Sequence, residues 1–114
     1  MDILFKNEYF VAVDKPGGWL SVPSRMGKDD QRPCLGHELE RSLGVRLWPV
    51  HRLDREVTGL ILYALMPEAH RAANSWFEQR LVHKTYEALT EGKTSPRAGH
   101  EFLWDSTLLR GKKR

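Results

Sequence analysis

The middle of the chain carries two hydrophobic patterns that predict regular structure. Residues 60–65 are apolar throughout, which is typical of a strand covered on both faces, and we expect this strand to be central in its sheet. After it, apolar residues from Ala69 to Phe77 recur with the i, i+3, i+4, i+7, i+8 spacing of one helix face, and Pro67 fits a first helical turn. These features predict a helix over residues 67–80.

A second helix and several shorter extended segments are predicted elsewhere. Leu35, Leu39 and Leu43 recur at every fourth position. They mark one face of a helix over residues 33–43, and Gly44 fits its C-terminal end. The predicted strands and extended segments are residues 3–5, 9–13, 19–22, 45–50, 84–90 and 102–109.

The order of these elements indicates how the sheet is built. Strand 60–65, helix 67–80 and strand 84–90 are spaced like a βαβ crossover, in which both strands run parallel and the helix lies on one face. An antiparallel arrangement is the open alternative, and it would separate the loop before the first strand from the start of the last. The elements predict an α+β fold, a mixed β-sheet with two helices, and 114 residues allow one domain at most.

Composition narrows the class of protein without identifying it. Apolar residues make up 40% of the chain and charged residues 29%, which is the balance of a soluble globular protein. No apolar run approaches the roughly 20 residues that span a bilayer, and the N-terminus does not read as a secretory signal, so we expect a cytoplasmic protein without membrane contact. The net charge of +3 comes from residues 84–114, where seven Lys/Arg stand against four Asp/Glu.

Cysteine and histidine form no recognisable site in the sequence. Cys34 is the only cysteine, which excludes an intramolecular disulfide and a cysteine-based zinc cluster. The five histidines share no metal-ligand spacing. No metal site is therefore predicted.

The most informative stretch is HRLDREVTG at residues 51–59, which leads directly into the predicted strand at residues 60–65. It places ionisable side chains on an irregular segment beside a rigid scaffold, where reactive side chains usually lie. The stretch resembles the HRLD signature of the ribosomal large-subunit type (RluA/RsuA-type) RNA pseudouridine synthases. In that family the aspartate of the signature is the essential catalytic residue, so the resemblance implies that Asp54 is catalytic.

Two further motifs occur in the family's order. KPGG at residues 15–18 follows a predicted strand pair and is similar to the Lys-Pro-x-Gly turn of the family's opening segment. KTY at residues 84–86 is similar to the family's Lys-x-Tyr motif, which implies that Tyr86 lies in the active site. An ordered set of three motifs is more specific than any one of them.

The resemblance implies an enzyme that isomerises uridine to pseudouridine in ribosomal or transfer RNA. The bond from uracil N1 to the ribose breaks, the base turns, and C5 is joined to the same ribose carbon, with no net redox change and no cofactor. A carboxylate at Asp54 suits this reaction as nucleophile, as base or as charge stabiliser, and these roles stay open. Tyr86 suits stacking on uracil, and Arg52 suits a contact with RNA when the target base leaves its stack.

One family motif has no counterpart in the sequence. Members continue through a motif like Gly-Arg-x-His-Gln-x-Arg, whose arginine pairs with the catalytic aspartate, and no segment here matches it. We therefore expect a partial catalytic domain over residues 1–114, with the motifs in residues 3–90 and a basic segment at 91–114. The alternative is a truncated, catalytically incomplete relative that only binds RNA or a partner chain. A homo-oligomer or a complementing chain would cover the sheet edges that a truncated sheet leaves open.

Each candidate residue also has a purely structural interpretation. Asp54 would be a turn carboxylate paired with Arg52 or Arg55, and Tyr86 would be a packing residue of a half-buried strand. The four tryptophans are candidates for stacking on bases. Among them Trp76 is assigned to the core, because it lies on the apolar face of the predicted helix.

Overall fold

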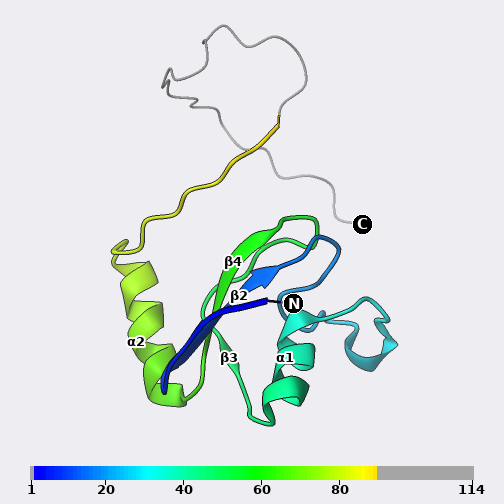
Figure 1. The fold of residues 1–114 in the computed structure, drawn as a ribbon, viewed down its shortest axis with the longest axis horizontal. Coiled ribbons are helices and arrows are strands. Elements are labelled where there is room, and N and C mark those ends of the chain that lie inside the picture. Colours follow the sequence, from blue (N-terminus) through cyan, green and yellow to red (C-terminus); the bar gives the residue numbers. More distant parts are fainter. Residues whose placement is uncertain (1, 90–114) are drawn as a thin grey trace, which may run out of the picture. The chain divides into compact units, whose positions relative to one another are not determined.

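The described part of the chain is built on a four-stranded sheet (Figure 1). The structure, a computed structural model, describes residues 2–89, of which residues 2–83 belong to one compact unit and residues 84–89 to a second. The elements of the first unit are β1 (Asp2–Lys6), β2 (Phe10–Lys15), a 3-10 helix (Gly27–Asp29), α1 (Leu35–Leu43), β3 (Trp48–Pro49), β4 (Gly59–Ala64) and α2 (Pro67–Glu78). The strand order is β1-β2-β4-β3, and every neighbouring pair is antiparallel.

The alternation of side chains along β2 and β4 fills one face of the sheet with a core. Val11 pairs with Tyr63 and Val13 with Ile61, and all four side chains are buried. Residues two apart on a strand point to the same face, so these four form one apolar surface, and the leucines of α1 pack on it. The buried members of this first cluster are Val11, Val13, Leu35, Leu39, Leu47, Leu53, Ile61 and Tyr63.

α2 covers the opposite face of the sheet with small side chains, so that the sheet lies between the two helices (Figure 1). The buried members of this second cluster are Val50, Ala64, Ala69 and Ala73. Trp76 lies at its rim, where its ring is 5.6 Å from that of Phe10 and its side chain is 41% exposed. The assignment of Trp76 to the core is therefore wrong: the buried positions of α2 are Ala69 and Ala73, and the indole lies at the edge of the cluster against Phe10.

Most of the predicted elements are confirmed. The fold is α+β with two helices, and α1 and α2 lie within the predicted ranges 33–43 and 67–80. β4 is an interior strand, as expected, although Leu60 near its start is 60% exposed. The segments at 3–5 and 9–13 are found as β1 and β2, the segment at 45–50 contributes β3, and the segment at 19–22 contributes one bridge, from Leu20 to Cys34.

The predicted crossover is wrong over the described residues. Residues 84–89 form no strand and all their side chains are exposed. Strands β1 to β4 pair only antiparallel, so the sheet is not mixed in this part of the chain. An alternating pattern shows that a segment suits a strand, but a strand also needs a neighbour that completes its hydrogen bonds. The predicted strand at residues 102–109 lies outside the described residues.

Two glycines define how α1 ends and how closely it packs. Gly44 adopts the left-handed conformation with φ 69° and donates its N–H to the Glu40 carbonyl, which confirms it as the helix stop. Gly36 is buried, and a Cβ there would lie 3.2 Å from the Ser21 carbonyl oxygen. The missing side chain therefore lets α1 lie directly against the segment that contains Ser21.

Ser21 joins the sheet to the segment that enters β4. The Tyr63 hydroxyl donates to the Ser21 carbonyl at 2.6 Å. The Ser21 hydroxyl in turn donates to the Leu53 carbonyl at 2.6 Å and accepts the Leu53 N–H at 2.9 Å. Burial raises the pKa of Tyr63 far above its usual value, with smaller contributions from Cys34 and Glu40. The phenol therefore stays protonated and remains a donor.

We predict that Tyr63→Phe lowers the free energy of unfolding by about 1–3 kcal/mol at neutral pH, because the buried Ser21 carbonyl loses its donor. In the wild type the neutral phenol is favoured by folding, so stability is full below the unfolded pKa of 10.0 and falls as the pH rises above it. Tyr63→Phe removes this part of the alkaline decline. Urea unfolding near pH 8 and near pH 11 measures both effects.

Tyr9→Phe is the matched control, because Tyr9 is 48% exposed. It should leave both the stability and its pH dependence unchanged. An alkaline decline of equal size in wild type and Tyr63→Phe would contradict the assignment to Tyr63.

Candidate functional site

The HRLD segment alternates between side chains that anchor it and side chains that face solvent. Leu53 is buried in the first cluster, whereas Arg52 and Asp54 are exposed. His51 is half-buried: its Nε2 accepts the Leu62 N–H at 3.1 Å, and its ring stacks on Phe77 at 5.3 Å. Arg52 and Asp54 are therefore presented outward by a segment that is fastened at His51 and Leu53.

A tight turn follows the catalytic candidate. The Val57 N–H donates to the Asp54 carbonyl at 3.0 Å, which closes a turn over residues 54–57. Arg55 and Glu56 lie at its tip, and their side chains approach to 3.5 Å. We call residues 51–58 the signature loop. Leu53 anchors the loop from within, and the C-terminal end of the loop leads directly into β4.

A buried ammonium group ties this loop to the KPGG turn. Lys15, at the end of β2, has an exposure of 0%, and its Nζ donates to three carbonyl oxygens. The acceptors are Pro16 at 3.1 Å, Trp19 at 2.7 Å and Arg55 at 2.9 Å. The Gly18 N–H also donates to the Arg55 carbonyl, at 2.7 Å. The strand end, the turn and the signature loop therefore form one hydrogen-bonded unit, which we call the lysine clamp.

Burial and the nearby carboxylates shift the pKa of Lys15 in opposite directions. Burial lowers the pKa of Lys15, because the ammonium loses its water, while the carboxylates of Glu56 and Asp54 act to raise it. Glu56 itself has a lowered pKa, chiefly through a hydrogen bond to its own backbone, with Arg55 and Lys15 adding to the effect. Asp54 thus stands on the surface beside a buried positive charge.

The structure brings two of the three candidate residues into one loop. Arg52 and Asp54 both lie in the signature loop and are both exposed. Tyr86 lies in the second unit, where its side chain is 62% exposed and its backbone forms no strand. The half-buried packing role considered for Tyr86 is therefore not found, and its place beside Asp54 stays a prediction.

The arginine partner expected for the aspartate is not found within residues 2–89. The ion pairs of arginine in this range join Arg32 to Asp30, Arg41 to Glu38, Arg55 to Glu56 and Arg71 to Glu68. None of them involves Asp54. The structural interpretation paired Asp54 with Arg52 or Arg55. No such ion pair is found among residues 2–89.

Sequence reasoning recognised the KPGG turn but missed what Lys15 and Ser21 do. A signal for Lys15 was present, because it follows Val11 and Val13 at the two-residue spacing of one strand face. A lysine at the inward position of a buried strand needs carbonyl partners. Ser21 carried no comparable signal, since nothing in the sequence shows that its hydroxyl meets Leu53.

Within residues 2–89, no group of three or more His, Cys, Asp and Glu side chains is arranged to hold a metal ion. The helices of the same range are also too short or too polar to cross a membrane.

We predict that Lys15→Met releases the signature loop. Three carbonyls lose a donor, so the free energy of unfolding should fall by about 1–3 kcal/mol. Amide hydrogen exchange should become faster at Gly18 and Val57, whose N–H groups bond within the clamp and the turn. Lys6→Met, on the exposed strand β1, is the matched control and should change neither quantity. Unchanged protection of Gly18 and Val57 in Lys15→Met would refute the clamp.

Comparison with known proteins relates the chain to one family. Residues 9–108 match the family model described as RNA pseudouridylate synthase. The chain is 35% identical over 92 residues to tRNA pseudouridine synthase C of Pectobacterium carotovorum subsp. carotovorum, covering 81% of this chain and 24% of that protein. It is 34% identical over 92 residues to tRNA pseudouridine synthase C of Yersinia pestis, covering 81% and 35%.

A solved structure supports the same relation. Human RNA Pseudouridylate Synthase Domain Containing 4 superposes with a TM-score of 0.51 at 26% identity, over 69% of this chain and 30% of that chain. The chain therefore spans about a quarter to a third of the length of the proteins compared here.

Proposed function

The chain belongs to the RNA pseudouridylate synthase family, and from this premise we propose that it isomerises uridine to pseudouridine in RNA with Asp54 as the catalytic residue. The observation that carries the proposal is the geometry of the signature loop. An exposed carboxylate stands on a loop that is fastened by Leu53 and by the lysine clamp. A fixed, accessible acid is what a reaction at a sugar carbon requires.

A carboxylate suits the reaction at two moments. When the bond from uracil N1 to the ribose breaks, the ribose carbon gains positive character, which an adjacent anion stabilises or captures covalently. After the base has turned and C5 has bonded to that carbon, the hydrogen on C5 leaves as a proton, and a carboxylate is a suitable acceptor. The uracil N1 that leaves the ribose takes up a proton, so atoms and electrons balance without a cofactor.

Arg52 is proposed to bind the RNA rather than to react. It lies two residues before Asp54 and is exposed on the same segment. A guanidinium there can contact a phosphate beside the target nucleotide, or fill the gap that the extruded uridine leaves. Tyr86 is proposed to stack on the uracil ring with its own ring and to offer its hydroxyl to a polar atom.

We propose transfer RNA as the substrate class. The relatives from Pectobacterium carotovorum subsp. carotovorum and Yersinia pestis are both named tRNA pseudouridine synthase C. Ribosomal RNA is the other substrate that the sequence motifs allow. Assays on both RNAs with the same protein preparation decide between them.

A second candidate is a relative that binds RNA, or a partner chain, without performing the reaction. It is favoured by one observation, the absence of an ion pair between Asp54 and any arginine within residues 2–89. A paired arginine would hold the aspartate ionised and fix its rotamer. Turnover by the chain as it stands would exclude this candidate.

We predict that Asp54→Ala lowers the rate of isomerisation by at least about a thousandfold, the order of loss expected when a reacting or charge-stabilising group is removed. The measurement is release of tritium from RNA labelled at uridine C5, because the C5 hydrogen is lost when C5 bonds to the ribose. Glu78→Ala, an exposed acid at the end of α2, is the control and should keep full activity. Equal release from Asp54→Ala and wild type would remove Asp54 from the mechanism.

We predict that Arg52→Ala weakens RNA binding about equally for different RNA sequences and reduces the dependence of log Kd on log salt by about one, as expected for the loss of one phosphate contact. Filter binding over a range of salt concentrations measures the slope. Arg71→Ala, an exposed arginine on α2, should leave the slope unchanged. A slope that is the same in Arg52→Ala and wild type would exclude the phosphate contact.

A further inference from the structure

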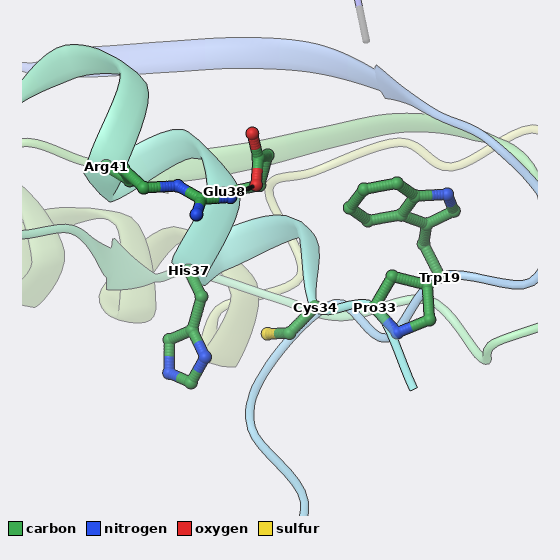
Figure 2. A pocket seen from close by; sticks show the side chains of 6 residues that line it. All are labelled: Trp19, Pro33, Cys34, His37, Glu38 and Arg41. Atoms are coloured by element: carbon green, nitrogen blue, oxygen red, sulfur yellow. Dashed lines mark hydrogen bonds and ion pairs between the residues drawn. The ribbon is translucent and has the colours of Figure 1, made fainter. Parts of the chain in front are cut away.

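A depression of about 420 Å³ opens between Trp19 and the first turns of α1 (Figure 2). Figure 2 shows Trp19 and Pro33 on one side and the α1 side chains His37, Glu38 and Arg41 on the other, with Cys34 between them. All of these residues lie in the first unit. The volume falls in the range of about 300–1,000 Å³ that is usual for small-molecule sites.

We propose that this depression binds an unpaired nucleobase of the RNA substrate, a neighbour of the target uridine, by stacking it on the Trp19 indole. The inference rests on the proposed function and adds a second nucleotide-binding site to it. None of the residues assigned to the reaction lines this depression.

One side of the depression offers a fixed aromatic surface. Trp19 is half-buried and packs against the first core cluster, so its ring is held from behind while the rest of it remains accessible. Its carbonyl is bonded to Lys15, which fixes the backbone as well. Single-stranded bases bind on aromatic side chains held in this way, because every base has a flat face and little conformational entropy is lost on stacking.

The other side offers polar groups of both kinds. Glu38 and Arg41 are neighbours on α1 and form an ion pair, and the Arg41 side chain is 77% exposed. A carboxylate accepts hydrogen bonds and a guanidinium donates them. The Watson–Crick edge of an unpaired base carries donors and acceptors side by side, so the pair complements a base edge. The opposite charges of the pair favour a neutral base over a bare phosphate.

The lysine clamp connects this depression to the signature loop. The same Nζ atom binds the Trp19 carbonyl at 2.7 Å and the Arg55 carbonyl at 2.9 Å, and Arg55 directly follows Asp54. A base on Trp19 is thus held at a fixed spacing from a uridine presented to Asp54. Both nucleotides must be unpaired, so the arrangement selects a uridine in a single-stranded loop over one in a duplex.

The experiment measures binding of a labelled RNA hairpin whose loop contains one uridine, in the Asp54→Ala background so that no turnover occurs. Trp19→Ala should weaken binding about 5- to 150-fold, the range reported for removing one stacking partner of a base. Trp76→Ala removes a tryptophan from α2 and should change the affinity less than twofold. The Arg41 side chain is largely exposed, so its removal should have little effect on folding. Arg41→Ala should weaken binding about 2- to 12-fold.

A second arm removes the base instead of the protein side chain. A series of hairpins carries one abasic nucleotide, placed at each loop position in turn. One hairpin of the series, with the abasic nucleotide beside the uridine, should bind the protein that retains Trp19 weakly. Its affinity should equal that of the intact hairpin for Trp19→Ala. That hairpin should lose no further affinity when Trp19→Ala is introduced, because the two changes remove the same contact. Trp19→Phe keeps a ring and should retain most of the affinity, which separates stacking from a folding defect.

The outcomes of the two arms are distinguishable. No binding of any hairpin by the intact protein overturns the proposed function and this inference together. Binding that is insensitive to Trp19→Ala and to every abasic position overturns the inference and leaves the proposed function standing. Loss of affinity in Trp19→Ala that is equal for intact and abasic hairpins also overturns it, because the contact is then not with a base.

Discussion

The arrangement of the site depends on one buried ammonium group. Lys15 has three N–H donors, and all three bind carbonyls: that of Pro16 in the KPGG turn, that of Trp19 directly after it, and that of Arg55 in the signature loop. Burying a charge is costly unless it is fully hydrogen-bonded, so the lysine is stable only when the turn and the loop are both in place. The carboxylates of Asp54 and Glu56 favour the charged form. The surface loop is thereby fixed from beneath, where no solvent competes.

The sequence was sufficient to predict the positions of the helices and of most strands, because each of these elements has a strong periodic pattern. The alanine-lined face of α2 and the four-residue spacing of the α1 leucines follow directly from burial on one side. Strand direction was not recoverable in the same way. The segment at 84–90 has the alternation of a strand, yet residues 84–89 are not assigned to any strand. Alternation reports which side chains suit a sheet, whereas pairing depends on residues that are distant in sequence.

Local sequence spacing predicted one part of the site, whereas contacts between distant residues determine the rest. Arg52 and Asp54 lie on the exposed side of an extended segment, and their two-residue spacing already placed them together. The anchors were harder to foresee, because they act across the fold. Ser21 holds Leu53 from 32 residues away, and Lys15 holds Arg55 from 40 residues away. A motif identifies a candidate for the reacting group, but the groups that fix its position are recognised only from the tertiary structure.

The clamp also keeps the Lys15 ammonium from pairing directly with the exposed carboxylate of Asp54. The Lys15 donors are all used by carbonyls, so the ammonium contributes its field at Asp54 without donating a hydrogen bond to the carboxylate. The Asp54 carboxylate therefore stays exposed on the surface of the loop. A direct salt bridge to the same lysine would occupy its oxygens. The separation of the buried charge from the exposed carboxylate follows from the number of donors on one side chain.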